Sequence, residues 1–118
     1  MPHRAITVTS RNHSAGATVL TVAGELDHHT APRFADALAE TPFGPGTPVV
    51  LDLAGVSYCD STGITVLVTA YRRAEETGCR LLLAGTGPDL LRVLQIVGLD
   101  QVFDFRPSTE QALDALRS

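Results

Sequence analysis

The chain has 118 residues, of which 44% are hydrophobic and 19% are charged, and its formal net charge is −4 at pH 7. This length fits one domain with a core of its own, and the composition is too apolar for a disordered chain. Nucleic acid and anionic membrane surfaces bind clusters of Lys and Arg, so we expect neither as a partner of this acidic chain.

The first residues of the chain bear on its compartment and its first strands. The segment MPHRAITVTS lacks the apolar run of a signal peptide, and no stretch of about 20 uncharged apolar residues is present to span a membrane. We therefore expect a cytoplasmic protein. The β-branched segments Ala5–Thr9 and Ala17–Ala23 predict a pair of strands, the second of which ends at Gly24.

A helix and a surface loop are predicted after this strand pair. Thr30 can cap a helix that ends near Glu40 and presents Phe34 and Leu38 on one face. The following TPFGPGTP holds three prolines and two glycines, which no regular element tolerates. These residues are therefore expected to form a surface loop.

The middle of the chain predicts a strand that leads into a long amphipathic helix. Val49–Leu53 is a short apolar run, and residues 54–60 are expected to form a loop. Apolar residues then recur at helical spacing, and Gly78 can end the helix in the left-handed conformation. The residues with this spacing are Ile64, Leu67, Val68 and Tyr71.

The last third of the chain predicts two more strands and two more helices. Arg80–Ala84 and Val102–Phe105 are apolar enough for short strands. Between them, a helix with Pro88 in its first turn leaves Val93 and Ile96 exposed. The buried stripe of this helix is predicted to consist of Leu90, Leu94 and Val97. A Ser-Thr-Glu-Gln capping box then predicts a final helix.

Strands that alternate with helices favour an α/β fold with a mixed, mostly parallel sheet of four to five strands and about four helices. We expect one domain over residues 1–118, with its core at residues 4–117. In sheets of this kind, functional sites gather at the carboxyl ends of the strands. Two loops follow strands directly, at residues 24–30 (GELDHHT) and 56–63 (VSYCDSTG).

The tetrapeptide Asp60-Ser61-Thr62-Gly63 lies where the second loop turns into a helix. Polar residues commonly cap helices, and capping alone would explain one of them. Three polar residues followed by a glycine exceed that need, and Gly63 would leave Ser61 accessible to a docking partner. The helix dipole and free N–H groups would favour a phosphate on Ser61, so we expect that this residue can be modified without unfolding.

The loop Glu25-Leu26-Asp27-His28-His29-Thr30 places two histidines beside two carboxylates. Metal binding needs a third ligand that the sequence does not identify, so we predict no metal and no cofactor. A triad of Ser61, one of the histidines and Asp27 would suit a serine hydrolase, but no nucleophile elbow surrounds Ser61. Cys59 and Cys79 are too few for a disulfide framework and are predicted to be small buried hydrophobes.

Together, the two loops resemble the motifs of a known family. Residues 24–31 resemble the first-loop motif of the STAS-domain anti-sigma factor antagonists, and Asp60-Ser61-Thr62-Gly63 resembles their phosphorylation motif. These proteins, also called anti-anti-sigma factors, regulate sporulation and stress responses in Gram-positive bacteria. The similarity of element order covers most of the chain. The resemblance therefore implies a STAS domain that regulates transcription by binding a partner and is not an enzyme.

The resemblance also implies a partner-switching cycle around Ser61. The unphosphorylated antagonist binds a cognate anti-sigma factor, which is a serine kinase with a histidine-kinase-type ATPase fold, and thereby releases the sigma factor. The kinase phosphorylates Ser61, with Thr62 a less favoured acceptor, and binding is blocked until a PP2C-type phosphatase removes the phosphate. The residues expected to bind the partner are Glu25, Asp27, His28, His29, Thr30, Asp60, Ser61, Thr62 and Gly63.

Two other functions stay open at this point. A STAS-like adaptor or ligand-sensing module would share the fold but would act outside sigma-factor control. A serine hydrolase would use Ser61 as its nucleophile. Phosphorylation of Ser61 by an anti-sigma kinase distinguishes the antagonist from both.

Overall fold

Five strands form a single sheet within residues 6–13 and 16–117, which are the residues that the computed structural model describes. In sheet order, which is also chain order, the strands are β1 (Ile6–Asn12), β2 (Thr18–Leu26), β3 (Val49–Cys59), β4 (Leu81–Ala84) and β5 (Asp104–Arg106). β1 runs antiparallel to β2, and all other neighbours are parallel. The expected start of the first strand at Ala5 and of the core at residue 4 lie outside the described residues.

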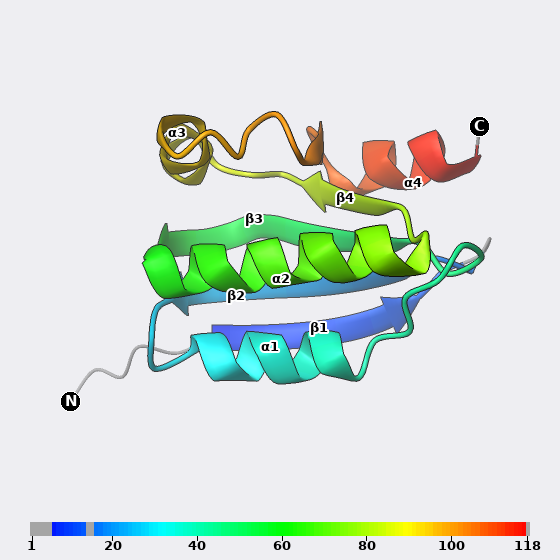
Figure 1. Ribbon diagram of the computed structural model, residues 1–118, viewed down its shortest axis with the longest axis horizontal. Coiled ribbons are helices and arrows are strands. Elements are labelled where there is room, and N and C mark those ends of the chain that lie inside the picture. Colours follow the sequence, from blue (N-terminus) through cyan, green and yellow to red (C-terminus); the bar gives the residue numbers. More distant parts are fainter. Residues whose placement is uncertain (1–5, 14–15, 118) are drawn as a thin grey trace.

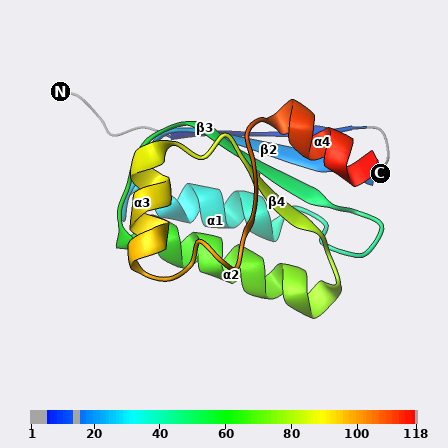
Figure 2. The same cartoon turned by 90° about the horizontal axis from the view of Figure 1, so that it is seen from above.

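The helices lie on both faces of this sheet. They are α1 (Ala31–Ala39), α2 (Ser61–Thr77), α3 (Pro88–Ile96) and α4 (Thr109–Arg117). Figure 1 shows α1 and α2 side by side along the strands, and Figure 2 shows α4 on the opposite face. In the described part of the chain, no helix combines the length and apolar character needed to cross a membrane. The predicted α/β fold with a mixed, mostly parallel sheet is confirmed.

Two hydrophobic cores hold the layers together. The larger core lies between the sheet and the helices α1, α2 and α3, which connect successive parallel strands and therefore share one face when their crossovers have the usual right hand. Its fully buried members include Phe34, Leu51, Leu67 and Leu94. The smaller core lies under α4 and contains Val19, Val50, Leu82, Ala84 and Ala112.

Both central strands are longer than the sequence predicts. The predicted end of the third strand at Leu53 is wrong, because β3 continues to Cys59, and β2 likewise runs past Gly24. The two strands stay paired over this extension through two register irregularities. A β-carbon at Gly55 would lie 2.8 Å from the Cβ of Ala23. Glycine is therefore needed here for the close approach of the strands, although Ala-Gly in the sequence suggests a loop.

Burial differs from the prediction at α3 and at the two cysteines. Val93 and Ile96 are exposed as expected, but Val97, which was assigned to the buried stripe, is 55% exposed. The reason is that α3 ends at Ile96 and Val97 is already its C-cap. Cys59 and Cys79 are free thiols that pack against the larger core but are only partly buried.

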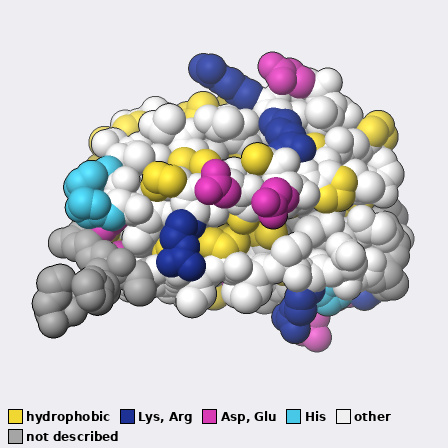
Figure 3. Space-filling model, turned by 90° about the horizontal axis from the view of Figure 1, so that it is seen from below, with side chains coloured by type: hydrophobic (Ala, Val, Ile, Leu, Met, Phe, Trp, Pro, Cys, Tyr) yellow, Lys and Arg dark blue, Asp and Glu magenta, His cyan; other side chains and the backbone are white. Residues whose placement is uncertain are grey.

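An arginine fixes α1 to α2. The guanidinium of Arg73 donates to the backbone carbonyls of Leu38 and Thr41, the second at 2.7 Å, and lies 4.2 Å from the ring centroid of Phe43. It borders an apolar hollow of about 210 Å³ between the two helices. On this side of the molecule, Figure 3 shows apolar side chains exposed between charged ones. The contacts of Arg73 are therefore structural, and this cation is not part of the surface formed by residues 24–30 and 56–63.

Candidate functional site

The two loops singled out in the sequence lie side by side at one edge of the sheet. β2 and β3 are parallel neighbours, and Leu26 pairs with Cys59 at their carboxyl ends. The backbone N–H of Asp60 donates to the carbonyl of Leu26 at 3.0 Å. Both loops accordingly emerge at the same end of the molecule in Figure 1. The two sequence motifs therefore form a single surface.

Ser61 is the first residue of α2, and its side chain is exposed. Asp60 is the N-cap, and its carboxylate accepts the N–H groups of Thr62 at 2.9 Å and of Gly63 at 3.3 Å. These two N–H groups are therefore already hydrogen-bonded. The sequence had suggested free N–H groups that could bind a phosphate, and this expectation is wrong for these two. Because Asp60 caps the helix, the Ser61 hydroxyl is not needed for capping. Thr62, in contrast, is half-buried.

Gly63 has a packing role that the sequence did not predict. It is buried, and a β-carbon at this position would lie 2.6 Å from the Sγ of Cys59 and 2.7 Å from the Cγ of Leu26. Any side chain would therefore push the first turn of α2 away from the ends of β2 and β3. The predicted contact between Gly63 and a partner stays a prediction, to which the structure adds this packing role. Gly63 positions Ser61 from the interior of the protein.

Asp27 organises the first loop, also from the interior. Asp27 is only 2% exposed. Its Oδ1 accepts hydrogen bonds from the backbone N–H groups of His29 at 2.9 Å and of Thr30 at 3.1 Å. Thr30 is buried as well, and its hydroxyl donates to the carbonyl of Glu25 at 2.6 Å. Thr30 is the N-cap residue of α1, as predicted, but its side chain forms no capping hydrogen bond. Asp27 and Thr30 therefore hold the shape of the loop, and their predicted contacts with a partner stay a prediction.

His28 and His29 are the exposed side chains of this loop, and their ring centroids lie 4.0 Å apart. Within residues 6–13 and 16–117, no three His, Cys, Asp or Glu side chains form a group that could hold a metal ion. Six of the predicted partner-binding residues reach the surface of the site. Three of them are exposed, namely His28, His29 and Ser61, and three are half-buried, namely Glu25, Asp60 and Thr62.

The electrostatic character of the site is acidic. Neither loop, residues 24–30 or residues 56–63, contains a Lys or an Arg. Burial, assisted by the negative charge of Asp60, raises the pKa of the Cys59 thiol to about 12. A thiol with this pKa stays protonated at neutral pH and is a poor nucleophile. Cys59 therefore supplies packing next to Ser61 and no reactive group.

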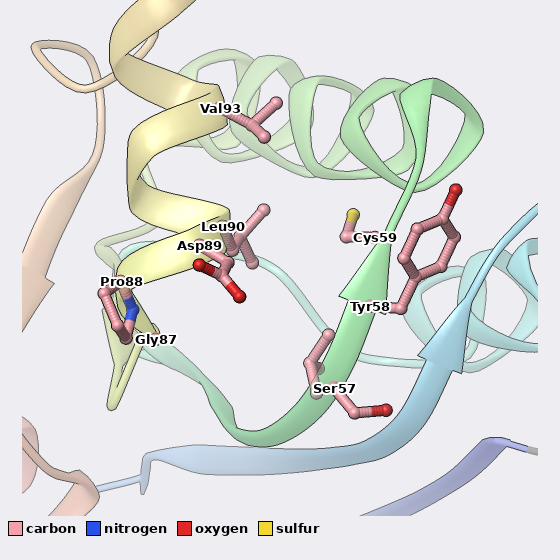
Figure 4. Close-up of a pocket in the computed structure, with 9 residues that line it drawn as sticks. Ser57, Tyr58, Cys59, Gly87, Pro88, Asp89, Leu90 and Val93 are labelled. Atoms are coloured by element: carbon pink, nitrogen blue, oxygen red, sulfur yellow. The ribbon is translucent and has the colours of Figure 1, made fainter.

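A groove lies beside these loops, and it was not predicted from the sequence. It has a volume of about 410 Å³ and separates the end of β3 from α3, as Figure 4 shows. The groove exists because β3 continues to Cys59, whereas the sequence suggested a loop over residues 54–60. The exposed Val93 on the groove side of α3 was the one signal in the sequence that pointed to it.

Comparisons with known proteins agree with this architecture. The family model described as STAS domain matches residues 8–112. The Anti-sigma-B factor antagonist of Listeria monocytogenes is 36% identical over 85 residues, which cover 72% of this chain and 75% of that protein. The Anti-sigma-F factor antagonist RsfB of Mycobacterium tuberculosis is 29% identical over 112 residues, which cover 95% of this chain and 90% of that protein.

Among solved structures, the crystal structure of an anti-sigma factor antagonist from Mycobacterium paratuberculosis has the same fold. Its TM-score is 0.82 at 31% sequence identity, and the superposition covers 98% of this chain and 97% of that one. The fold, the family match and these relatives all indicate the same family. The chain belongs to the STAS domain family, and the relatives it matches within that family are anti-sigma factor antagonists.

Proposed function

We propose that this chain is an anti-sigma factor antagonist and that phosphorylation of Ser61 switches its binding state. The observation that carries the proposal is the start of α2, where an exposed serine stands beside a helix cap that another residue provides. A hydroxyl free of a capping role can be modified without loss of the hydrogen bonds that hold the helix start. The relatives named anti-sigma factor antagonists support the same class of function.

Exposure favours Ser61 over Thr62 as the phosphate acceptor. A kinase must bring the γ-phosphate of ATP in line with the acceptor hydroxyl, which requires open space around that oxygen. Ser61 is exposed, whereas Thr62 is half-buried and has its N–H held by Asp60. We therefore assign the modification to Ser61.

A phosphate on Ser61 would change the charge of the surface without changing the fold. It adds about −1.5 to −2 elementary charges at neutral pH. Asp60 is the adjacent residue, Glu25 lies on the neighbouring strand, and neither loop contains a Lys or an Arg. A partner fitted to the unmodified surface would have to desolvate this charge or meet it with its own cations. Repulsion across the interface is then sufficient to prevent association.

The proposed partners follow from this switch. They are a cognate anti-sigma factor that is a serine kinase with a histidine-kinase-type ATPase fold, and a PP2C-type phosphatase that removes the phosphate. The partner would contact the exposed His28, His29 and Ser61, together with the half-buried Glu25, Asp60 and Thr62. ATP and its metal ion belong to the kinase. Because sigma factors act on RNA polymerase inside the cell, the proposed location is the cytoplasm.

The test is phosphorylation of the purified chain. We would incubate it with each anti-sigma kinase encoded in the same genome and with Mg-ATP, and then map the phosphate by mass spectrometry. The expected result is one phosphate on Ser61, its loss in Ser61→Ala and its retention in the control Thr69→Ala, which removes an exposed hydroxyl from α2 outside the two loops. Tight binding to a partner without any phosphate on Ser61 or Thr62 would favour the adaptor. Covalent labelling of Ser61 by a fluorophosphonate probe would favour the hydrolase.

A further inference from the structure

The apolar hollow of about 210 Å³ beside Arg73 opens between α1 and α2, which run side by side along the sheet in Figure 1. Short side chains on both helices leave this space, where larger ones would fill it. These short side chains are Ala35, Ala39 and Ala70. Leu38, Phe43 and Val66 supply the larger apolar walls. The hollow is therefore built mainly from apolar side chains of α1, α2 and the residues that follow α1.

The hollow also has two polar lining residues, Thr69 and Arg73. The Thr69 hydroxyl already donates to the carbonyl of Thr65 at 3.0 Å. The guanidinium of Arg73 donates to the carbonyls of Leu38 and Thr41, which are its hydrogen-bond acceptors among the described residues. These contacts use two of the five N–H groups that a guanidinium carries. Arg73 therefore has N–H groups left for a further acceptor in the hollow.

The surroundings of Arg73 favour an anionic acceptor. The residue is half-buried, and its guanidinium lies 4.2 Å from the ring centroid of Phe43. Partial burial weakens the screening of this charge by water and salt. In the described part of the chain, the lining of the hollow includes no Asp or Glu. An anion in the hollow would therefore meet a cation without an opposing charge in the lining.

The size and lining of the hollow define the rest of the ligand. Water is a poor occupant of an apolar hollow, because a bound water needs about two to four polar partners. A cavity of about 150 Å³ in another protein is large enough for benzene, so this hollow admits a phenyl or branched alkyl group with a short polar head. A carboxylate head matches the planar N–H fork of an arginine. Inorganic phosphate or sulfate has no apolar part to cover the walls.

We propose that the hollow between α1 and α2 binds a small organic carboxylate with a phenyl or branched alkyl tail. The tail packs against Leu38, Phe43 and Val66, and the carboxylate accepts hydrogen bonds from Arg73. This inference goes beyond the proposed function, because the hollow includes neither Ser61 nor any other residue of the two loops. A ligand that binds only the folded form also raises its stability, so the carboxylate should raise the Tm of the chain.

A matched pair of ligands tests the carboxylate on the wild-type chain. 3-Phenylpropanoate and its neutral amide, 3-phenylpropanamide, have the same tail and differ only in the charge and atoms of the head. Each would be titrated into the nitrogen-15-labelled chain at pH 7, and its Kd would be obtained from the shifts of the amide signals. We expect a Kd of about 1 mM or tighter for the acid and binding at least about tenfold weaker for the amide. The largest shifts should fall on Ala39, Phe43 and Thr69.

Three leucine variants test the location of the site. Ala39→Leu and Thr69→Leu place a larger side chain in the hollow from opposite helices, and both positions are exposed. Gln111→Leu adds the same side chain at an exposed position of α4, which Figure 2 shows on the opposite face of the sheet. We expect the first two variants to weaken binding of 3-phenylpropanoate at least about fivefold and Gln111→Leu to change it less than about twofold.

Any of three results would overturn the inference. They are the absence of saturable shifts up to about 20 mM 3-phenylpropanoate, equal affinity for the acid and the amide, and wild-type affinity in both Ala39→Leu and Thr69→Leu. Thermal melts show whether each variant is folded, and the comparison of the two ligands on the wild-type chain does not depend on the variants. Phosphorylation of Ser61 is tested separately, so the proposed function stands or falls independently of this site.

Discussion

Replacing Asp27 by Ala should destabilise the protein even though the residue lies in a loop. The substitution removes the acceptor of the His29 N–H, which costs about 1–3 kcal/mol when a buried donor is left unpaired. The Thr30 N–H loses its bond to Oδ1 but keeps a longer one, of 3.2 Å, to the Asp27 carbonyl, so this loss is about 0.5–1.5 kcal/mol. Together these losses lower the free energy of unfolding by about 1.5–4.5 kcal/mol.

The assay is thermal unfolding followed by circular dichroism. For a chain of this length, a loss of about 1.5–4.5 kcal/mol corresponds to a fall in Tm of about 6–18 °C. Asp27→Asn keeps one oxygen acceptor and should recover most of that loss. Asp36→Ala, which removes an exposed carboxylate from α1, is the matched control and should change the stability by less than about 0.5 kcal/mol. A Tm of Asp27→Ala within about 2 °C of wild type would refute the structural role of this carboxylate.

Three further predictions concern residues around the same site. Gly63→Ala should lower the free energy of unfolding by about 1 kcal/mol in urea titrations, because the clash of the new β-carbon with Leu26 outweighs the gain in helix propensity. An unchanged urea midpoint of unfolding would contradict the close packing around Gly63. Arg73→Lys should lower the free energy of unfolding by about 1–2 kcal/mol, because lysine cannot keep both carbonyl contacts and the stacking on the Phe43 ring. Arg72→Lys changes the exposed neighbour and should lower it by less than about 0.5 kcal/mol; equal effects of the two variants would count against the structural role of Arg73. Because folding raises the pKa of Cys59 from 9.0 to about 12, the folded form is favoured below pH 9 and loses this advantage as the pH rises toward 12. Iodoacetamide at pH 8 should therefore label Cys59 slowly in the native chain and rapidly in urea, and equal rates would argue against burial of the thiol.

Much of the fold is predictable because it depends on local patterns. Helical spacing of apolar residues predicts α2, and the prolines and glycines between α1 and β3 predict the intervening loop. Strand ends are less predictable, since pairing with a neighbouring strand can extend them. Ala54-Gly55 suggests a loop in isolation, but Gly55 sits against Ala23 and lets β3 continue. The contact between Gly55 and Ala23 cannot be predicted from either residue alone.

The candidate site is predictable in position but not in the roles of its residues. Parallel order brings residues 24–30 and 56–63 to one edge, which the sequence motifs indicate together. Asp27, Thr30 and Gly63 looked like surface residues because Asp, Thr and Gly are common in exposed loops. Their burial depends on three-dimensional contacts with the loop backbone and with Leu26, which no sequence spacing encodes.

The most direct test compares the anti-sigma factor affinity of two forms of the chain, one unmodified and one phosphorylated only on Ser61. Both forms would be titrated by calorimetry, and their far-UV circular dichroism would be recorded. We predict a loss of affinity of about 100-fold, equivalent to about 2.7 kcal/mol, with no change in the spectra, because the phosphate adds charge beside Asp60 without disturbing its cap. Equal affinity of the two forms would contradict the account, and so would a loss of affinity that accompanies unfolding.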